Sequence, residues 1–286
     1  NLFYFGFGVK QDYLKAKEYY EKSEKQNNSD ALVSIGNLYL EGDGVEKDYS
    51  KAKEYFHLAV QKNNSRALIS LGVLYYFGKG VQKDYLKTKF YNEQAAKQND
   101  RNAIINLSQL YYSGEGVEQD YLKAKELLEL AIQNNSIRAF TILGCLYLEG
   151  KGVSKDYSKA KEYFELAFRL NDPQGAICLG NLYYFGFGVK RNFFKSKEYY
   201  EIAAKKKESQ ALVNLGNLYL FGNGVKQDCV KAIEYFEEAA KQKNVQGMNT
   251  LGVLYFEGKF APINFAKARE YFELAAEQNH PEALLF

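Results

Sequence analysis

Residues 65–84 read SRALISLGVLYYFGKGVQKD, and this pattern returns along the chain with a period of 36 residues. Its first glycine belongs to a series with this period: Gly36, Gly72, Gly144, Gly180, Gly216 and Gly252. The one position of the series without a glycine is Ser108. Its Gly-x-Gly pair belongs to a second series with the same period: Gly6/Gly8, Gly42/Gly44, Gly78/Gly80, Gly114/Gly116, Gly150/Gly152, Gly186/Gly188 and Gly222/Gly224. Self-similarity at a fixed period of this length indicates an array of stacked repeats.

Each repeat predicts two helices. In the unit that starts at Ser29, apolar residues follow the i, i+3, i+4, i+7 spacing of one helical face: Ala31, Leu32, Ile35, Leu38 and Tyr39. The residues that precede this first helix are Asn28, Asn64, Asp100, Ser136, Asp172, Glu208, Asn244 and His280. Most of them are of the types that favour the N-cap position. The first helix should end at Gly42, because glycine adopts the left-handed conformation of a helix exit. Asp48 then caps a second helix with its own apolar stripe: Tyr49, Ala52, Tyr55, Phe56 and Ala59.

Gly36 lies inside the first helix, where glycine costs roughly 1 kcal/mol relative to alanine. Its recurrence indicates a compensating contact, in which the neighbouring helix approaches the glycine backbone closely. One helix pair of this size cannot bury its own apolar face, so stability must come from stacking on neighbouring pairs. The sequence therefore predicts an all-α, right-handed α-solenoid of antiparallel helix pairs.

We expect one repeat domain over residues 1–286. It consists of a partial unit 1–28, full units that start at residues 29, 65, 101, 137, 173, 209 and 245, and a partial unit 281–286. Asn1 and Phe286 both align with the middle of a first helix, so we expect the chain to begin and end inside a repeat. Phe260 occupies the slot of the second loop glycine, with Pro262 close behind, so this loop is expected to fold differently.

The motif Ala67-x3-Leu71-Gly72-x-Leu74-Tyr75-x2-Gly78-x-Gly80-Val81-x2-Asp84 resembles the Sel-one-like repeat, a relative of the tetratricopeptide repeat. The resemblance covers nearly the whole chain. It implies a binding scaffold, since members of that family mostly serve as adaptors. Some act in ER-associated degradation, some activate cell-wall synthases and some are bacterial effectors.

Secreted bacterial members of that family carry a cysteine pair in each repeat. Here Cys145, Cys178 and Cys229 lie in three different units at different phases, so we expect no such bracing. A reducing compartment follows, and we expect a cytoplasmic protein, with the ER lumen as the alternative. No run of 18 apolar residues is present to span a membrane.

The chain contains few of the residues and motifs that form catalytic, metal or phosphate-binding sites. His57 stands where the other units have glutamate, so we expect it on a solvated helix face, and His280 occupies a cap position. Neither has a Cys, Asp or second His nearby at metal-ligand spacing. The Gly-x-Gly pairs follow a helix and lack the Gly-Lys-Ser/Thr ending of a phosphate-binding loop. We therefore predict no catalytic, metal or cofactor site and no small-molecule substrate.

One stripe of the first helix changes from unit to unit. From Asp30 it runs through Ser34, Asn37 and Glu41, and its counterparts differ in each repeat. Free drift of exposed positions and a ligand groove both explain such variation. The groove is favoured by asparagines, whose amides offer a donor and an acceptor to a peptide backbone, and by phenylalanines at the end of the stripe. The candidate partner-binding residues are Asn37, Phe77, Asn106, Asn181, Phe185, Asn214, Asn217 and Phe221.

These features predict a protein–protein adaptor whose concave groove receives an extended segment of a protein or peptide partner. An ER-lumenal quality-control adaptor is the alternative within that class. An RNA-binding solenoid is the alternative outside it, because helical repeats can read single-stranded RNA. Nucleic acid is disfavoured by a net charge of only +3 and by glutamates interleaved with the lysines of the second helix.

Overall fold

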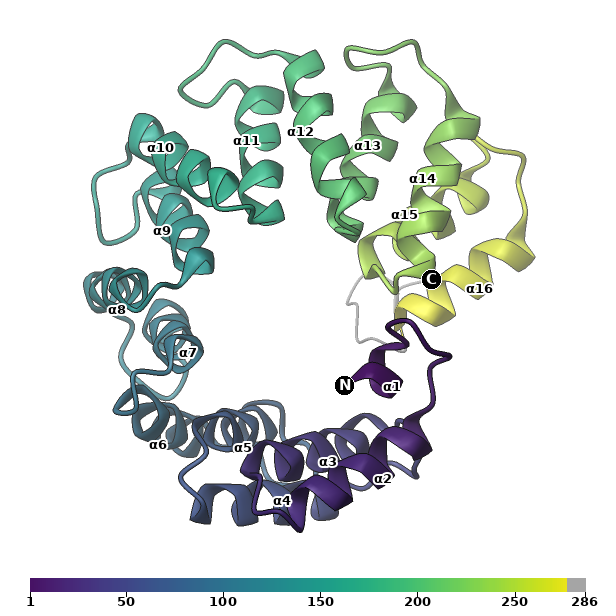
Figure 1. Cartoon of the computed structure of the whole chain (residues 1–286). Helices are drawn as coiled ribbons and strands as arrows, with labels where there is room; N and C mark the ends of the chain where they lie inside the picture. Colours follow the sequence, from purple (N-terminus) through teal and green to yellow (C-terminus); the bar gives the residue numbers. More distant parts are fainter. Residues whose placement is uncertain (277–286) are drawn as a thin grey trace. The chain divides into compact units, whose positions relative to one another are not determined.

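The computed structural model describes residues 1–276, and every regular element in that range is an α-helix (Figure 1). The partial unit 281–286 and His280 lie outside the described residues. The helices are α1 (Leu2–Phe5), α2 (Tyr13–Glu24), α3 (Ser29–Glu41), α4 (Tyr49–Gln61), α5 (Ser65–Phe77), α6 (Tyr85–Ala96), α7 (Arg101–Ser113), α8 (Tyr121–Gln133), α9 (Ile137–Glu149), α10 (Tyr157–Arg169), α11 (Pro173–Phe185), α12 (Phe193–Lys205), α13 (Ser209–Phe221), α14 (Cys229–Lys241), α15 (Val245–Glu257) and α16 (Phe265–Ala276).

The chain contains two compact units, Asn1–Ala139 and Phe140–Phe286. Within each unit, the first helix of a repeat packs against its own second helix, as in α5 with α6 and α13 with α14. The second helix also packs against the first helix of the next repeat, as in α4 with α5 and α12 with α13. This nearest-neighbour packing confirms the α-solenoid. That residues 1–286 form a single domain stays a prediction.

The predicted first helices begin at the expected residues because their caps are local. Asn64 accepts a hydrogen bond from the backbone N–H of Ala67, and Asn28 accepts one from Asp30. Glu208, which is not a typical N-cap residue, precedes α13 without a side-chain cap hydrogen bond. In the second helices, the Asp48 carboxylate accepts from the backbone N–H of Lys51, as expected.

The connection between the two helices is closed by a repeated backbone hydrogen bond. Gly42 ends α3 in the left-handed conformation, with φ 80° and ψ 26°. The N–H of Asp48 then returns to the carbonyl of Tyr39 at 2.9 Å. In the last loop, Gly258 is also left-handed and the Asn264 N–H reaches the Tyr255 carbonyl. The loop with Phe260 therefore keeps the same two ends, and it differs in lacking a second residue with positive φ.

The helical glycine is a packing contact, as its recurrence predicted. A Cβ atom placed on Gly36 would lie 2.5 Å from Cε1 of Phe56, which is fully buried. The same close contact joins Gly144 to Phe164, Gly180 to Tyr200, Gly216 to Phe236 and Gly252 to Phe272. In the repeat where Ser108 replaces the glycine, the aromatic ring is also replaced, by Leu128. In that repeat both positions of the contact have changed.

The second loop glycine makes a contact between repeats that the turn interpretation missed. A Cβ on Gly188 would lie 2.4 Å from the Cβ of Tyr157, which opens the second helix of the preceding repeat. The same relation joins Gly44 to Tyr13, Gly80 to Tyr49, Gly116 to Tyr85 and Gly224 to Phe193. At the last loop the sizes are exchanged, since Phe260 replaces the glycine and Cys229 replaces the aromatic residue. Both pack against the same core cluster.

The residue between the two loop glycines adds a polar link to the preceding repeat. Tyr4 donates its hydroxyl hydrogen to Asp43, and Tyr76 donates to Glu115 at 2.7 Å. The hydrogen bond to Glu115, with burial, raises the pKa of Tyr76 to about 12. At the equivalent place, the Asn223 amide donates to the Tyr184 hydroxyl. The loops that carry Asp43, Glu115 and Asn223 are therefore held to the preceding repeat by packing and by a hydrogen bond.

Candidate partner-binding surface

Within each unit, the variable positions of the first helices form a surface that we call the first-helix stripe. It contains the eight candidate residues and the residues at the same repeat positions. Asn37, Phe77 and Asn106 lie on α3, α5 and α7 in the unit 1–139. The other five lie on two helices of the second unit: Asn181 and Phe185 on α11, and Asn214, Asn217 and Phe221 on α13.

The phenylalanines of the stripe are exposed, as a binding role requires. Phe77, Phe185 and Phe221 expose 62%, 58% and 58% of their surface. Each also touches another ring, which fixes its position. Phe185 stacks on Phe187 with ring centroids 5.3 Å apart, and Phe221 meets Phe260 edge-on at 6.2 Å. Large, positioned aromatic side chains in contact with water are suited to receive apolar groups of a partner.

The asparagines are half-buried, which corrects the expectation that their positions are simply exposed. The Asn181 side-chain oxygen accepts hydrogen bonds from the Tyr200 hydroxyl at 2.6 Å and from the Asn214 amide at 3.4 Å. Because Tyr200 sits against Gly180 with 2% of its surface exposed, its hydroxyl needs this partner. Asn181 therefore has a structural role in addition to any role in binding.

The remaining asparagines divide into two kinds. Asn106 donates to the side-chain oxygen of Asn92 at 3.0 Å, so its amide nitrogen is also used within the protein. Asn37 and Asn217 are half-buried, and among residues 1–276 neither side chain has a hydrogen-bond partner. Their donors and acceptors are available to water or to another molecule.

Two thiols also meet on the stripe. Cys145 and Cys178 are free cysteines on α9 and α11, and their side chains share a hydrogen bond. That bond lowers the pKa of the Cys145 thiol, whereas the same bond and burial raise the pKa of the Cys178 thiol. Cys145 and Cys178 occupy the repeat positions of Asn37 and Ser34, and their contact was not predicted. Their spacing equals that of Asn181 and Asn214, which is the signal that could have found it.

The second helices carry balanced charge. A lysine and a glutamate four residues later form an ion pair at 3.0 to 3.5 Å in five units: Lys17–Glu21, Lys89–Glu93, Lys125–Glu129, Lys161–Glu165 and Lys197–Glu201. Exposed pairs of this kind contribute little to stability. They do cancel the positive field that a polyanion would need.

His57 takes the place of the glutamate in the unit 29–64 and is half-buried instead of solvated. Burial and the nearby Lys53 charge lower the pKa of His57 below the ordinary 6.5. Since the folded state disfavours the protonated ring, His57 contributes stability above the unfolded-state pKa. That contribution is lost as the pH falls below about 6.5.

We therefore expect His57→Gln to reduce the loss of stability between pH 7 and pH 5, by a small amount because the ring is partly exposed. Urea unfolding at both pH values measures this difference. His57→Glu, which restores the Lys–Glu pair of the other units, should remove the same pH dependence. A wild-type loss of stability that both variants retain would contradict the assignment to His57.

Among residues 1–276, no cluster of three or more His, Cys, Asp or Glu side chains has the arrangement of a metal site. No helix in the same range is long and apolar enough to cross a membrane.

Stacked helix pairs with a fixed 36-residue period and a variable first-helix stripe define a helical-repeat protein. The chain belongs to the Sel1 repeat family, whose model matches residues 1–28, 29–64, 65–100, 101–136, 141–172, 176–207, 209–244 and 245–280. Sel1 repeat proteins are commonly protein-interaction scaffolds and are generally not enzymes. No curated protein matches the chain significantly.

Solved structures share the fold. A Sel1 repeat protein from Oxalobacter formigenes is 29% identical with a TM-score of 0.66, over 86% of this chain and 99% of that one. A protective antigen of uropathogenic Escherichia coli with an SLR fold is 26% identical with a TM-score of 0.58. That match covers 99% of this chain, which spans 61% of the length of the antigen. An immunity protein from Pseudomonas aeruginosa, 19% identical over 74% of this chain and 81% of that one, has a TM-score of 0.61 and shares the fold alone.

Proposed function

We propose that this protein is an interaction scaffold whose first-helix stripe receives an extended segment of a protein partner. The observation that carries the proposal is the arrangement on α11 and α13. There, the exposed rings of Phe185 and Phe221 each lie one helical turn beyond a half-buried asparagine, Asn181 or Asn217.

The two kinds of side chain suit two parts of an extended peptide. The Asn217 amide has no hydrogen-bond partner among the described residues, and the Asn181 amide nitrogen is likewise not used, although its oxygen is. These groups can pair with the peptide backbone, which offers one donor and one acceptor at each residue. The phenyl rings can cover apolar side chains of the same peptide. Such binding selects an extended chain with apolar residues at intervals.

A variant that removes both amides tests the proposal. Asn181→Ala alone would leave the buried Tyr200 hydroxyl without its partner, so it must be combined with Tyr200→Phe. Phenylalanine fits this position, since Phe56, Phe164 and Phe236 occupy it in other units. We expect Asn181→Ala/Asn217→Ala/Tyr200→Phe to melt near the wild type and to bind the partner about tenfold more weakly, because two hydrogen bonds are lost.

The measurement is quantitative capture of partners from a lysate of the source organism, followed by titration of the captured partner against each variant. Tyr200→Phe alone is the matched control for the background. Glu165→Ala, which removes a second-helix ion pair with Lys161, is the control for the opposite face. Unchanged affinity in the triple variant together with reduced affinity in Glu165→Ala would place the partner on the second helices and refute the proposal.

A cytoplasmic, reducing location is part of the same proposal, since the three cysteines are free thiols. The ER lumen is the alternative location.

A further inference from the structure

One repeat contains a cavity where its neighbours contain a side chain. The residue that packs against the helical glycine is an aromatic ring in five repeats: Phe56, Phe164, Tyr200, Phe236 and Phe272. In the repeat 65–100 this residue is Asn92, and the facing glycine is Gly72. Here the glycine is retained although the ring is absent, in contrast to the Ser108/Leu128 repeat, where both changed.

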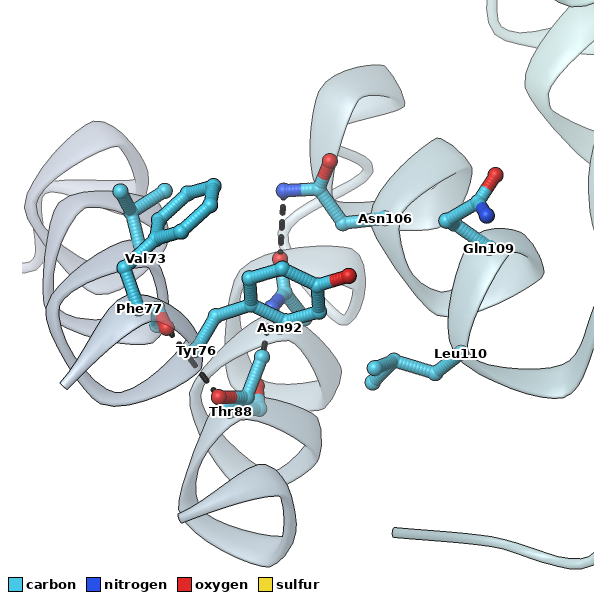
Figure 2. Close-up of a pocket in the computed structure, with 9 residues that line it drawn as sticks. Val73, Tyr76, Phe77, Thr88, Asn92, Asn106, Gln109 and Leu110 are labelled. Atoms are coloured by element: carbon cyan, nitrogen blue, oxygen red, sulfur yellow. Dashed lines mark hydrogen bonds between the residues drawn. The ribbon is translucent and has the colours of Figure 1, made fainter. Parts of the chain in front are cut away.

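The space left by the missing ring is a cavity of about 210 Å³ between α5, α6 and α7 (Figure 2). Its walls are Gly72, Val73, Tyr76, Phe77, Thr88, Asn92, Asn106, Gln109 and Leu110. Most of this lining is apolar. An engineered cavity of about 150 Å³ in another protein is known to hold a benzene molecule, whereas drug-sized ligands need about 300 Å³ or more. The volume therefore suits a single six-membered ring.

The polar groups at the back of the cavity are already paired, so they do not demand a polar ligand. The Asn92 amide donates to the carbonyl of Thr88 at 2.8 Å, and its oxygen accepts from Asn106 at 3.0 Å. The Thr88 hydroxyl donates to the carbonyl of Gly72 at 3.2 Å. Figure 2 shows these bonds at the base, with the Phe77 ring and the Gln109 amide at the sides. Asn92 and Thr88 are almost fully buried, so the bonds hold the cavity walls in place.

The cavity opens on the first-helix stripe, because Val73, Phe77 and Asn106 are stripe residues. We infer that it is a binding site for one aromatic side chain, phenylalanine or tyrosine, supplied by a partner segment. This inference deepens the proposed function and rests on it for the origin of the ring. The Asn92 amide lies against Gly72, and the partner's ring would lie beside it, in the space that the smaller side chain leaves.

p-Cresol, the side-chain analogue of tyrosine, tests the cavity on the whole chain without any partner. We expect it to shift the methyl NMR signals of Val73 and Leu110, with a dissociation constant on the order of 1 mM for so small a ligand. Asn92→Phe supplies the missing ring from within and should abolish these shifts. The same variant should raise the melting temperature by about 2–6 °C, as cavity-filling substitutions do.

Two further variants make the result decisive. Asn92→Leu, which copies Leu128 of the next repeat, should also weaken p-cresol binding, and it provides the test if Asn92→Phe does not fold. Asn102→Phe makes the same chemical change at an exposed position of α7 and should leave binding unaltered. The absence of p-cresol shifts in the wild type, or equal shifts in the wild type and a folded Asn92 variant, would overturn the inference. Because no partner is present, this outcome is independent of the capture experiment above.

Discussion

Replacing Gly144 with leucine is expected to lower the free energy of unfolding by more than about 2 kcal/mol, the cost of forcing a large side chain into a packed contact. A Cβ at this position would lie 2.5 Å from Cε1 of Phe164 and 3.2 Å from the carbonyl oxygen of Ala160. Phe164 is fully buried. Denaturant unfolding followed by circular dichroism measures the loss, and a stability equal to that of the wild type would show that the glycine is not a packing contact.

The repeat at Ser108 and Leu128 supplies the control for Gly144. Gly144→Ser alone should destabilise, because its side chain meets the same ring. Gly144→Ser combined with Phe164→Leu copies the natural pair, so the double variant should be more stable than the sum of the two single losses predicts. Additive losses would mean that the two side chains do not share the contact.

Replacing Gly188 with alanine is expected to cost about 2–4 kcal/mol, because two penalties act together. The residue has φ +65°, a conformation that is strained for any residue with a Cβ. The added Cβ would also lie 2.4 Å from the Cβ of Tyr157 in the preceding repeat. The free energy of unfolding, measured in denaturant, reports the sum of the two terms.

Gly8 separates the two penalties. It has φ +70° at the equivalent loop position, and no neighbouring atom lies within 4 Å of the site of its Cβ. Gly8→Ala should therefore cost only the backbone strain of about 1–2 kcal/mol. If both substitutions cost the same, the second loop glycine is only a turn residue and the proposed contact between repeats is refuted.

The helix boundaries were predictable because their causes lie within a few residues of one another. A cap such as Asn64 and a left-handed exit such as Gly78 act on the backbone next to them. The recurrence of Gly36 predicted a close helix contact, and the Phe56 ring now accounts for it. The role of Gly80 was only half predicted, since its contact with Tyr49 joins consecutive repeats and leaves no local pattern.

The candidate surface was predictable in composition but not in its hydrogen bonding. Variation among repeats placed Asn181 and Asn217 on the same stripe. Their difference depends on the second helix, where Tyr200 brings a hydroxyl to Asn181 and the fully buried Phe236 has none to offer Asn217. The pairing of Cys145 with Cys178 likewise depends on how neighbouring first helices pack.

By itself, the sequence determined the repeat period, the helices and the positions free to vary, because periodicity, caps and glycine conformation are properties of the local chain. The tertiary structure decided which of the variable side chains form hydrogen bonds within the protein and where a cavity remains between the helices. Asn92 shows the difference. Its place in the repeat is visible in the sequence, but the cavity beside it is not, and neither are the hydrogen bonds by which Thr88 and Asn106 hold Asn92. Whether packing closes over a missing ring depends on all the surrounding side chains at once, and no short stretch of sequence contains that information.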